Sequence, residues 1–133
     1  MKTYTDSPYL SLQEVTLGDL SGKNGYLLEL GSADNTVQLA SGPDTAIGVM
    51  FEKFEKGDTV SVRLLGKGGT VKVKAGGVIA KGGRVVWGTG GKVIAQPTTT
   101  GTYRTLGRSL TPGTTADGDV IEILDVIERV SVA

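Results

Sequence analysis

Two glycine-rich stretches that contain lysine are the first candidates for chemistry, because loops of this composition can hold a phosphate group. They are residues 66–70 (GKGGT) and residues 88–92 (GTGGK). A phosphate-binding loop requires Gly-x-x-x-x-Gly-Lys-Ser/Thr and a following helix whose N-terminus faces the anion. Neither stretch completes this pattern, since Val86 stands where glycine is needed and Lys92 precedes Val93. Both stretches are interpreted as turns between strands.

The other residues that could do chemistry are isolated. The chain has no cysteine and no histidine, which removes thiolate ligands, the commonest general base and the commonest metal ligand. Ser109, Lys81 and Asp119 belong to no nucleophile–base signature such as Gly-x-Ser-x-Gly. Asp117, Asp119 and Glu122 lack the spacing of a calcium-binding EF-hand loop, and residues 117–119 are interpreted as a turn. The sequence therefore predicts no catalytic residue, no metal, no cofactor and no enzymatic activity.

Glycine accounts for 21 of the 133 residues, and short runs rich in Val, Ile, Leu and Thr separate the glycines. Glycine adopts positive φ at tight turns without steric cost. This pattern predicts many short strands joined by tight turns, and hence an all-β fold, either a small β-barrel or a sandwich. A chain of this length can bury one sizeable core. We expect a single barrel-like domain at residues 12–133.

The clearest strand pattern covers residues 59–64 and 70–74, where polar and apolar residues alternate. With residues 67–69 as the turn, the two segments are predicted to form a hairpin. The apolar residues then share a core face: Val60, Val62, Leu64, Val71 and Val73. The polar residues then face water: Thr59, Ser61, Arg63, Lys72 and Lys74.

The C-terminal run at residues 120–130 is ambiguous. Positions 120, 123, 124 and 127 are apolar and fit one face of a helix, whereas the six β-branched residues of the run favour a strand. We interpret it as a strand with a bulge near Leu124 and Asp125.

Two stretches share one pattern, which predicts an internal duplication over about residues 25–65 and 83–127. Four matched pairs lie 58, 56, 59 and 61 residues apart: Gly25 with Gly83, Val37 with Val93, Gly48 with Gly107, and Gly57 with Gly118. Insertions in loops would produce this drift. Coincidence is the alternative, because Gly-Asp before a strand is common turn chemistry. If the duplication is real, the two copies should close onto one another as a barrel or sandwich.

Residues 1–11 show neither helical nor strand periodicity and are predicted to form an extended N-terminal arm. Tyr4, Pro8, Tyr9 and Leu10 are candidate partner-binding residues within it, since tyrosine is enriched at protein interfaces. The arm is expected to become ordered against a neighbouring subunit. The alternative is a frayed terminus.

Trp87 and Tyr103 are the other candidate partner-binding residues. Carbohydrate-binding modules stack sugars on exposed rings, and such a module would need these two side chains together in a groove. Trp87 ends an apolar run at residues 85–87, which favours a role in core or interface packing.

Charge makes nucleic acid an unexpected partner. Fourteen basic residues balance fourteen acidic ones, and no basic stripe is visible. The first residues lack the apolar stretch of a secretory signal, and no segment reaches membrane-spanning length. We expect no membrane partner, and synthesis in a cytoplasm.

Residues 75–86 (AGGVIAKGGRVV) and 91–95 (GKVIA), followed by 105–107 (TLG) and 118–123 (GDVIEI), resemble the capsid decoration (cement) proteins of tailed bacteriophages. The resemblance covers about residues 25–127. It implies a β-barrel-like structural protein of the virion that sits on the outer capsid surface, commonly as a homotrimer, and binds the major capsid protein. Its role would be to cement neighbouring capsomers and stabilise the head. The family offers no catalytic residues, and the alternatives are a carbohydrate- or receptor-binding module and, last, a small hydrolase.

Overall fold

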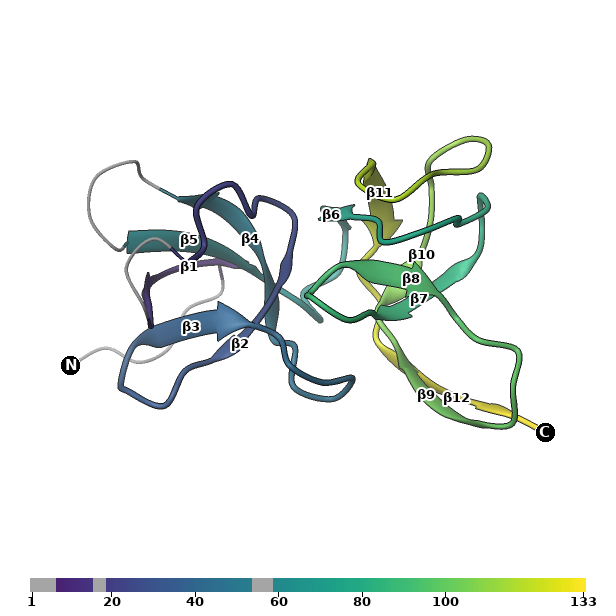
Figure 1. Cartoon of the computed structure of the whole chain (residues 1–133), viewed down its shortest axis with the longest axis horizontal. Coiled ribbons are helices and arrows are strands. Elements are labelled where there is room, and N and C mark those ends of the chain that lie inside the picture. Colours follow the sequence, from purple (N-terminus) through teal and green to yellow (C-terminus); the bar gives the residue numbers. More distant parts are fainter. Residues whose placement is uncertain (1–6, 16–18, 54–58) are drawn as a thin grey trace.

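The computed structural model describes residues 7–15, 19–53 and 59–133, and within these ranges the protein consists of strands, turns and loops without a helix. The predicted all-β fold is confirmed. Figure 1 shows two lobes, with the N-terminal half of the chain in one and the C-terminal half in the other. The twelve strands are β1 (Tyr9–Glu14), β2 (Leu27–Leu30), β3 (Thr36–Leu39), β4 (Gly48–Lys53), β5 (Thr59–Leu64), β6 (Thr70–Lys74), β7 (Arg84–Trp87), β8 (Val93–Ala95), β9 (Gly101–Thr105), β10 (Gly107–Arg108), β11 (Val120–Leu124) and β12 (Glu128–Val132).

The first lobe is a closed barrel with the strand order β1-β3-β2-β4-β5. β1 closes the ring, because it pairs antiparallel with β5 and parallel with β3. Closure leaves no free strand edge. The barrel is filled by buried apolar side chains from the strands and by Leu20, which precedes β2. The strand residues are Leu12, Leu28, Val37, Met50, Val60 and Val62.

The second lobe repeats this strand order with β6-β8-β7-β10-β11. β6 pairs with β11, β7 pairs with β8, and β10 pairs with β7, all antiparallel. Two isolated bridges complete the ring, a parallel one between Ala75 and Val93 and an antiparallel one between Ser109 and Ile123. Each strand of the first barrel therefore has a counterpart with the same neighbours and directions in the second.

The pairing registers match residues between the two barrels. The matched pairs include Leu28 with Val85, Val37 with Val93, Gly48 with Gly107, and Val62 with Ile123. Three of these offsets, 56, 59 and 61 residues, equal the predicted ones, while that of β2 and β7 is 57 rather than 58. The repeated unit also contains β1 and β6, which precede the predicted starts at residues 25 and 83. An internal duplication as the origin of this pairing remains our interpretation.

The predicted hairpin of residues 59–74 is wrong. β5 pairs with β1 and β4, and β6 pairs with β11, so residues 65–69 cross from one barrel to the other. The alternation of faces is correct, but Val62 and Val73 fill different clusters. Arg63 is buried rather than facing water, because the chain provides it with a carboxylate partner.

The C-terminal run is a pair of strands rather than one. β11 ends at Leu124 and β12 begins at Glu128, and the buried side chain of Asp125 occupies the break. The predicted bulge is thus a change of sheet. β12 pairs with β9 as a separate ribbon, which extends away from the second barrel toward the C-terminus in Figure 1.

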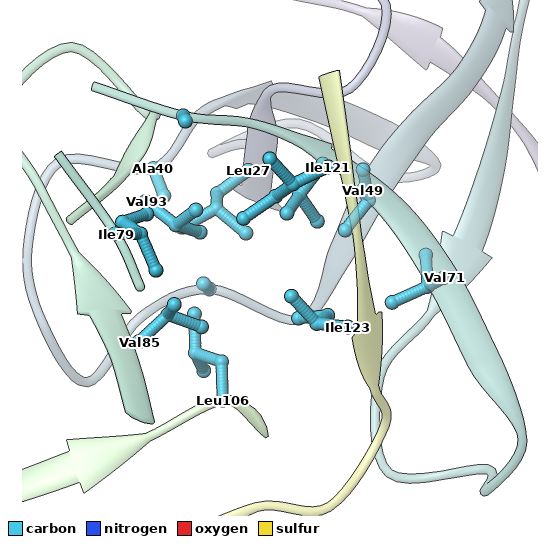
Figure 2. Packing of buried hydrophobic residues seen from close by; sticks show 13 residues of the cluster. Leu27, Ala40, Val49, Val71, Ile79, Val85, Val93, Leu106, Ile121 and Ile123 are labelled. Carbon is cyan, nitrogen blue, oxygen red and sulfur yellow. The ribbon is translucent and has the colours of Figure 1, made fainter. Parts of the chain in front are cut away.

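One apolar cluster connects the two barrels. Leu27, Ala40 and Val49 from the first barrel lie in the same cluster as Val93 and Ile121 from the second, as Figure 2 shows. Two backbone hydrogen bonds reinforce this contact, from Lys74 N to Gly25 O at 2.8 Å and from Leu27 N to Gly91 O at 2.6 Å. The barrels are therefore held by buried contacts as well as by the chain that links them. In the part of the chain described here, no helix could cross a membrane.

Candidate functional site

A groove of about 360 Å³ lies where the two barrels meet, and we call it the inter-barrel groove. Residues of both barrels line it: Tyr9, Asn24, Gly25, Val49, Met50, Phe51, Arg63, Thr70, Val71, Lys72, Val120 and Glu122. Tyr9, Phe51 and Val120 are 45%, 56% and 56% exposed. The rings of Tyr9 and Phe51 contact edge to face, with centroids 5.0 Å apart and planes at 63°. Exposed aromatic side chains beside a groove are typical anchors of a protein interface.

A break in strand pairing positions Phe51. The register of β4 against β5 shifts between Met50 and Glu52, so Phe51 is the extra residue of a β-bulge. A bulge bends its strand and re-aims a side chain. Met50 is buried in the first barrel, whereas Phe51 points out to contact Tyr9 at the start of β1. The aromatic pair therefore projects from two strands of the closed barrel.

Charged residues at the groove are arranged in pairs. Lys72 lies opposite Glu122 across β6 and β11. The deeper Arg63 donates from Nη1 to Asp125 Oδ2 at 2.9 Å. Among the described residues there is no group of three or more Asp, Glu, His or Cys that could hold a metal. The groove is equipped for binding through apolar rings with a nearly neutral surround.

Three of the four predicted arm residues, Pro8, Tyr9 and Leu10, lie in or beside the first strand of the barrel rather than in an extended arm. Tyr9 and Leu10 are part of β1, and Pro8 O accepts a hydrogen bond from Leu64 N at 2.6 Å. Residues 9–11 are thus strand residues, and the arm cannot extend to residue 11. The free edges of β3 and β5 explain this, because a closed barrel requires a strand between them. Tyr4 lies outside the described residues.

Trp87 and Tyr103 line a second hollow of about 280 Å³, separate in its lining from the inter-barrel groove. Both rings are half-buried. The indole Nε1–H of Trp87 donates to Ala40 O at 2.9 Å, and the Tyr103 hydroxyl donates to Thr99 O at 3.0 Å. The polar atoms that would orient a sugar are therefore already used within the chain. A partner contact through these two residues stays a prediction.

Sequence reasoning missed Phe51 and Val120. The signal for Phe51 was a run of three consecutive apolar residues, Val49-Met50-Phe51, which breaks the alternation of a strand with one buried face. Val120 was assigned only to a strand. Its exposure follows from the register of β11, in which Ile121 and Ile123 point inward.

The lysine–glycine turn at residues 66–70 does bind an anion, but the anion belongs to the chain. Asp125 Oδ1 accepts from Gly66 N at 2.8 Å, and Asp125 Oδ2 accepts from Lys67 N at 2.9 Å. Successive backbone amides of a turn form a concave site that suits negative charge. Asp125 fills this site.

A second carboxylate, that of Glu29, is held by a hydrogen-bond network in the first barrel. Burial raises the pKa of Glu29, but hydrogen bonds from Thr45, Ser41 and Gln38 outweigh burial and lower the pKa to about 2. Gln38 Nε2 donates at 2.6 Å and Ser41 N at 2.7 Å. All four residues belong to β2, β3 or the loop after it, so the network fixes that loop. At the surface, a hydrogen bond to Asp117 raises the pKa of Lys92.

Comparison with known proteins gives two matches of different weight. A family model described as phage cement protein matches residues 15–124. The solved structure of the head fiber gp8.5 N base in bacteriophage phi29 is similar, with a TM-score of 0.56 and 18% identity, over 89% of this chain and 92% of that chain. At this identity the second match shows the fold alone. A search of curated proteins finds no match. The family model covers most of the chain, and the chain therefore belongs to the phage cement protein family, whose members are structural proteins of the virion that bind the capsid.

Proposed function

We propose that this protein binds the outer surface of a phage capsid and cements neighbouring capsomers, with the major capsid protein as its partner. The observation that carries the proposal, beside family membership, is the exposed Tyr9–Phe51 pair at the rim of the inter-barrel groove. Exposed apolar side chains that gather beside a groove are typical of a surface that binds a partner. The role is structural and needs neither a catalytic residue nor a cofactor.

The way the barrels are joined supports a bridging role. A clamp between two capsomers must resist movement of one capsomer against the other. The shared apolar cluster and the hydrogen bond from Leu27 N to Gly91 O hold the barrels in one arrangement. A rigid binder loses little conformational entropy on docking. Many copies on a repeated lattice can then stabilise the shell through avidity even when each contact is weak.

Self-association into a homotrimer is part of the proposal. Three copies around a three-fold position would each present the same groove to equivalent capsid subunits, since closed symmetry repeats one surface. The N-terminal residues, Tyr4 among them, are proposed to contact the shell. The absence of a nucleic-acid partner agrees with the balance of fourteen basic and fourteen acidic residues. Synthesis in the host cytoplasm, without a membrane partner, is also part of the proposal.

The test is co-sedimentation of the purified protein with mature, undecorated shells of the phage that encodes it. Saturable binding at a fixed ratio to the capsid subunit, together with a higher temperature of shell disruption, is the expected result. Removal of residues 1–6 should weaken binding without loss of the fold. Absence of binding to intact shells would reject the proposal.

A second candidate, a carbohydrate- or receptor-binding module, is favoured by one observation. Trp87 and Tyr103 line the same hollow, as a carbohydrate-binding module would require. Since Trp87 is the only tryptophan, its fluorescence reports on this hollow directly. A change in emission on addition of host surface polysaccharide, without any binding to shells, would put this candidate first.

A further inference from the structure

Two arginines of the second barrel face each other, and neither forms an ion pair with a carboxylate in the described part of the chain. Arg84 of β7 lies directly opposite Arg108 of β10. Like charges directly opposite on paired strands destabilise a sheet. The Nε of Arg84 is buried and has no hydrogen-bond partner. Among the described residues, neither guanidinium lies in any of the ion pairs, which join Arg63 to Asp125, Lys92 to Asp117, and Arg129 to Asp44.

A second pair of arginines in the same half of the chain shows how the protein normally satisfies such an arrangement. Arg104 of β9 lies opposite Arg129 of β12. There, Arg104 Nη1 donates to Ala46 O at 3.0 Å, and Arg129 Nη2 lies 3.4 Å from Asp44 Oδ1. Residues 7–15, 19–53 and 59–133 therefore supply acceptors to the guanidinium groups of one pair of opposed arginines and none to those of the other pair. A buried donor that lacks an acceptor is costly and calls for an explanation.

The unpartnered pair borders a hollow of about 290 Å³, which we call the arginine hollow. Its lining is Arg84, Gly107, Arg108, Leu124, Val126 and Glu128. Leu124 and Val126 are 38% and 51% exposed, so apolar walls stand beside the two guanidinium groups. Two positive charges and one negative charge leave the hollow with a net charge of +1. One carboxylate neutralises this charge, whereas a polyanion such as nucleic acid would bring more negative charge than the hollow can balance.

We propose that the arginine hollow receives a carboxylate side chain, Asp or Glu, from an extended segment of the capsid shell, with a neighbouring apolar side chain of that segment against Leu124 and Val126. This inference rests on the proposed function and adds a specific contact to it. The guanidinium group binds a carboxylate through two parallel hydrogen bonds, and an incoming carboxylate would also relieve the repulsion between Arg84 and Arg108. The hollow thus gives specificity, while the inter-barrel groove supplies apolar contact.

The first arm of the test needs no shells. A capped peptide of alternating Asp and Leu is added to the full-length protein while the arginine Nε–H signals are followed by NMR. The expected result is a saturable shift of the Arg84 signal, with no shift for the matched peptide of Asn and Leu. An Arg84 signal that moves with neither peptide, or equally with both, would overturn the inference.

The second arm uses mature shells and three variants. Arg84→Gln and Arg108→Gln should each weaken binding about tenfold or more, as expected when one partner of a charge pair at an interface is removed. Arg129→Gln, which alters an arginine that already has Asp44, should bind as the unaltered protein does. Equal binding by all the variants would reject the arginine hollow and leave the cement function intact. If the unaltered protein does not bind shells, the proposed function fails, and the peptide titration still decides whether the hollow takes a carboxylate.

Discussion

Arg63 and Asp125 form a buried ion pair at the junction of the two barrels, with Arg63 Nη1 2.9 Å from Asp125 Oδ2. The two side chains are 8% and 0% exposed. Arg63 also donates to Leu64 O and Gly68 O, and Asp125 accepts from the amides of Gly66 and Lys67. The pair therefore fixes the segment that carries the chain from one barrel to the other.

Replacing either member of this pair should strongly destabilise the protein. Asp125→Asn removes the charge that compensates Arg63, and the uncompensated buried charge should cost about 3–5 kcal/mol. The free energy of unfolding, measured by denaturant titration, checks this value. Asp117→Asn is the control, because its ion pair with Lys92 is exposed and should contribute at most about 1 kcal/mol. Equal losses in the two variants would contradict a special role for the junction.

Glu29 should make stability depend on pH in the acid range. Its pKa is lowered from 4.5 to about 2 in the folded protein. A carboxyl group with a lowered folded pKa stabilises the fold fully above its unfolded pKa, and this contribution is lost as the pH falls through the folded value. Between pH 4.5 and pH 2, the unfolding free energy should therefore fall more steeply in the unaltered protein than in Glu29→Gln. Parallel pH profiles would show that the hydrogen-bond network does not hold the charged form.

Gly48 and Gly107 occupy matched positions in the two barrels and should both resist substitution. A Cβ on Gly48 would lie 2.9 Å from Arg63 O, and one on Gly107 would overlap Leu124 O. Because backbone blocks both positions, alanine should force the strands apart. We expect losses of about 2–4 kcal/mol, in the upper range of single substitutions. Gly77→Ala, where a Cβ meets nothing within 4 Å, is the control and should be nearly neutral. Thermal unfolding of the three variants provides the comparison.

Local pattern was enough to predict some features and not others. The inward positions of β6 and β11, such as Val73 and Ile121, follow from alternation, and the match of Gly48 with Gly107 is visible in the sequence. The strand partners cannot be predicted from local pattern. Whether residues 65–69 form a hairpin turn or a link between the barrels depends on how both barrels close. A side chain 62 residues away decides the burial of Arg63.

The candidate site could be predicted only in part, because it too depends on contacts between residues distant in the sequence. Tyr9 was identified by residue type, but its place in β1 depends on the unfilled edges of β3 and β5. Phe51 is exposed because of a one-residue bulge, and the register of two strands determines where that bulge falls. No local signal in either segment specifies that the two rings should meet.

Substitution of Trp87 distinguishes a role of the second hollow in stability from a role in binding a partner. Phenylalanine at this position removes the hydrogen bond to Ala40 O, which joins the two barrels, and should cost about 1 kcal/mol. If the role of Trp87 is internal, Trp87→Phe should bind shells with unchanged affinity once it is folded. Circular dichroism and co-sedimentation of the same sample separate the two effects. Loss of shell binding by a well-folded variant would support the predicted partner contact instead.

Phe51 should be required for shell binding but not for folding. Phe51→Ser removes the larger part of the exposed aromatic pair, and at 56% exposure the side chain contributes little to the core. Truncation of an aromatic anchor at an interface typically costs about 2 kcal/mol or more, which corresponds to roughly a thirtyfold loss of affinity per copy. Leu30→Ser is the matched control, since Leu30 belongs to the same barrel, is 62% exposed and lies outside the inter-barrel groove. Both variants should unfold at nearly the same temperature as the unaltered protein. If they sediment equally with shells, the inter-barrel groove is not the contact surface, because an anchor and an uninvolved residue of similar exposure would then behave alike.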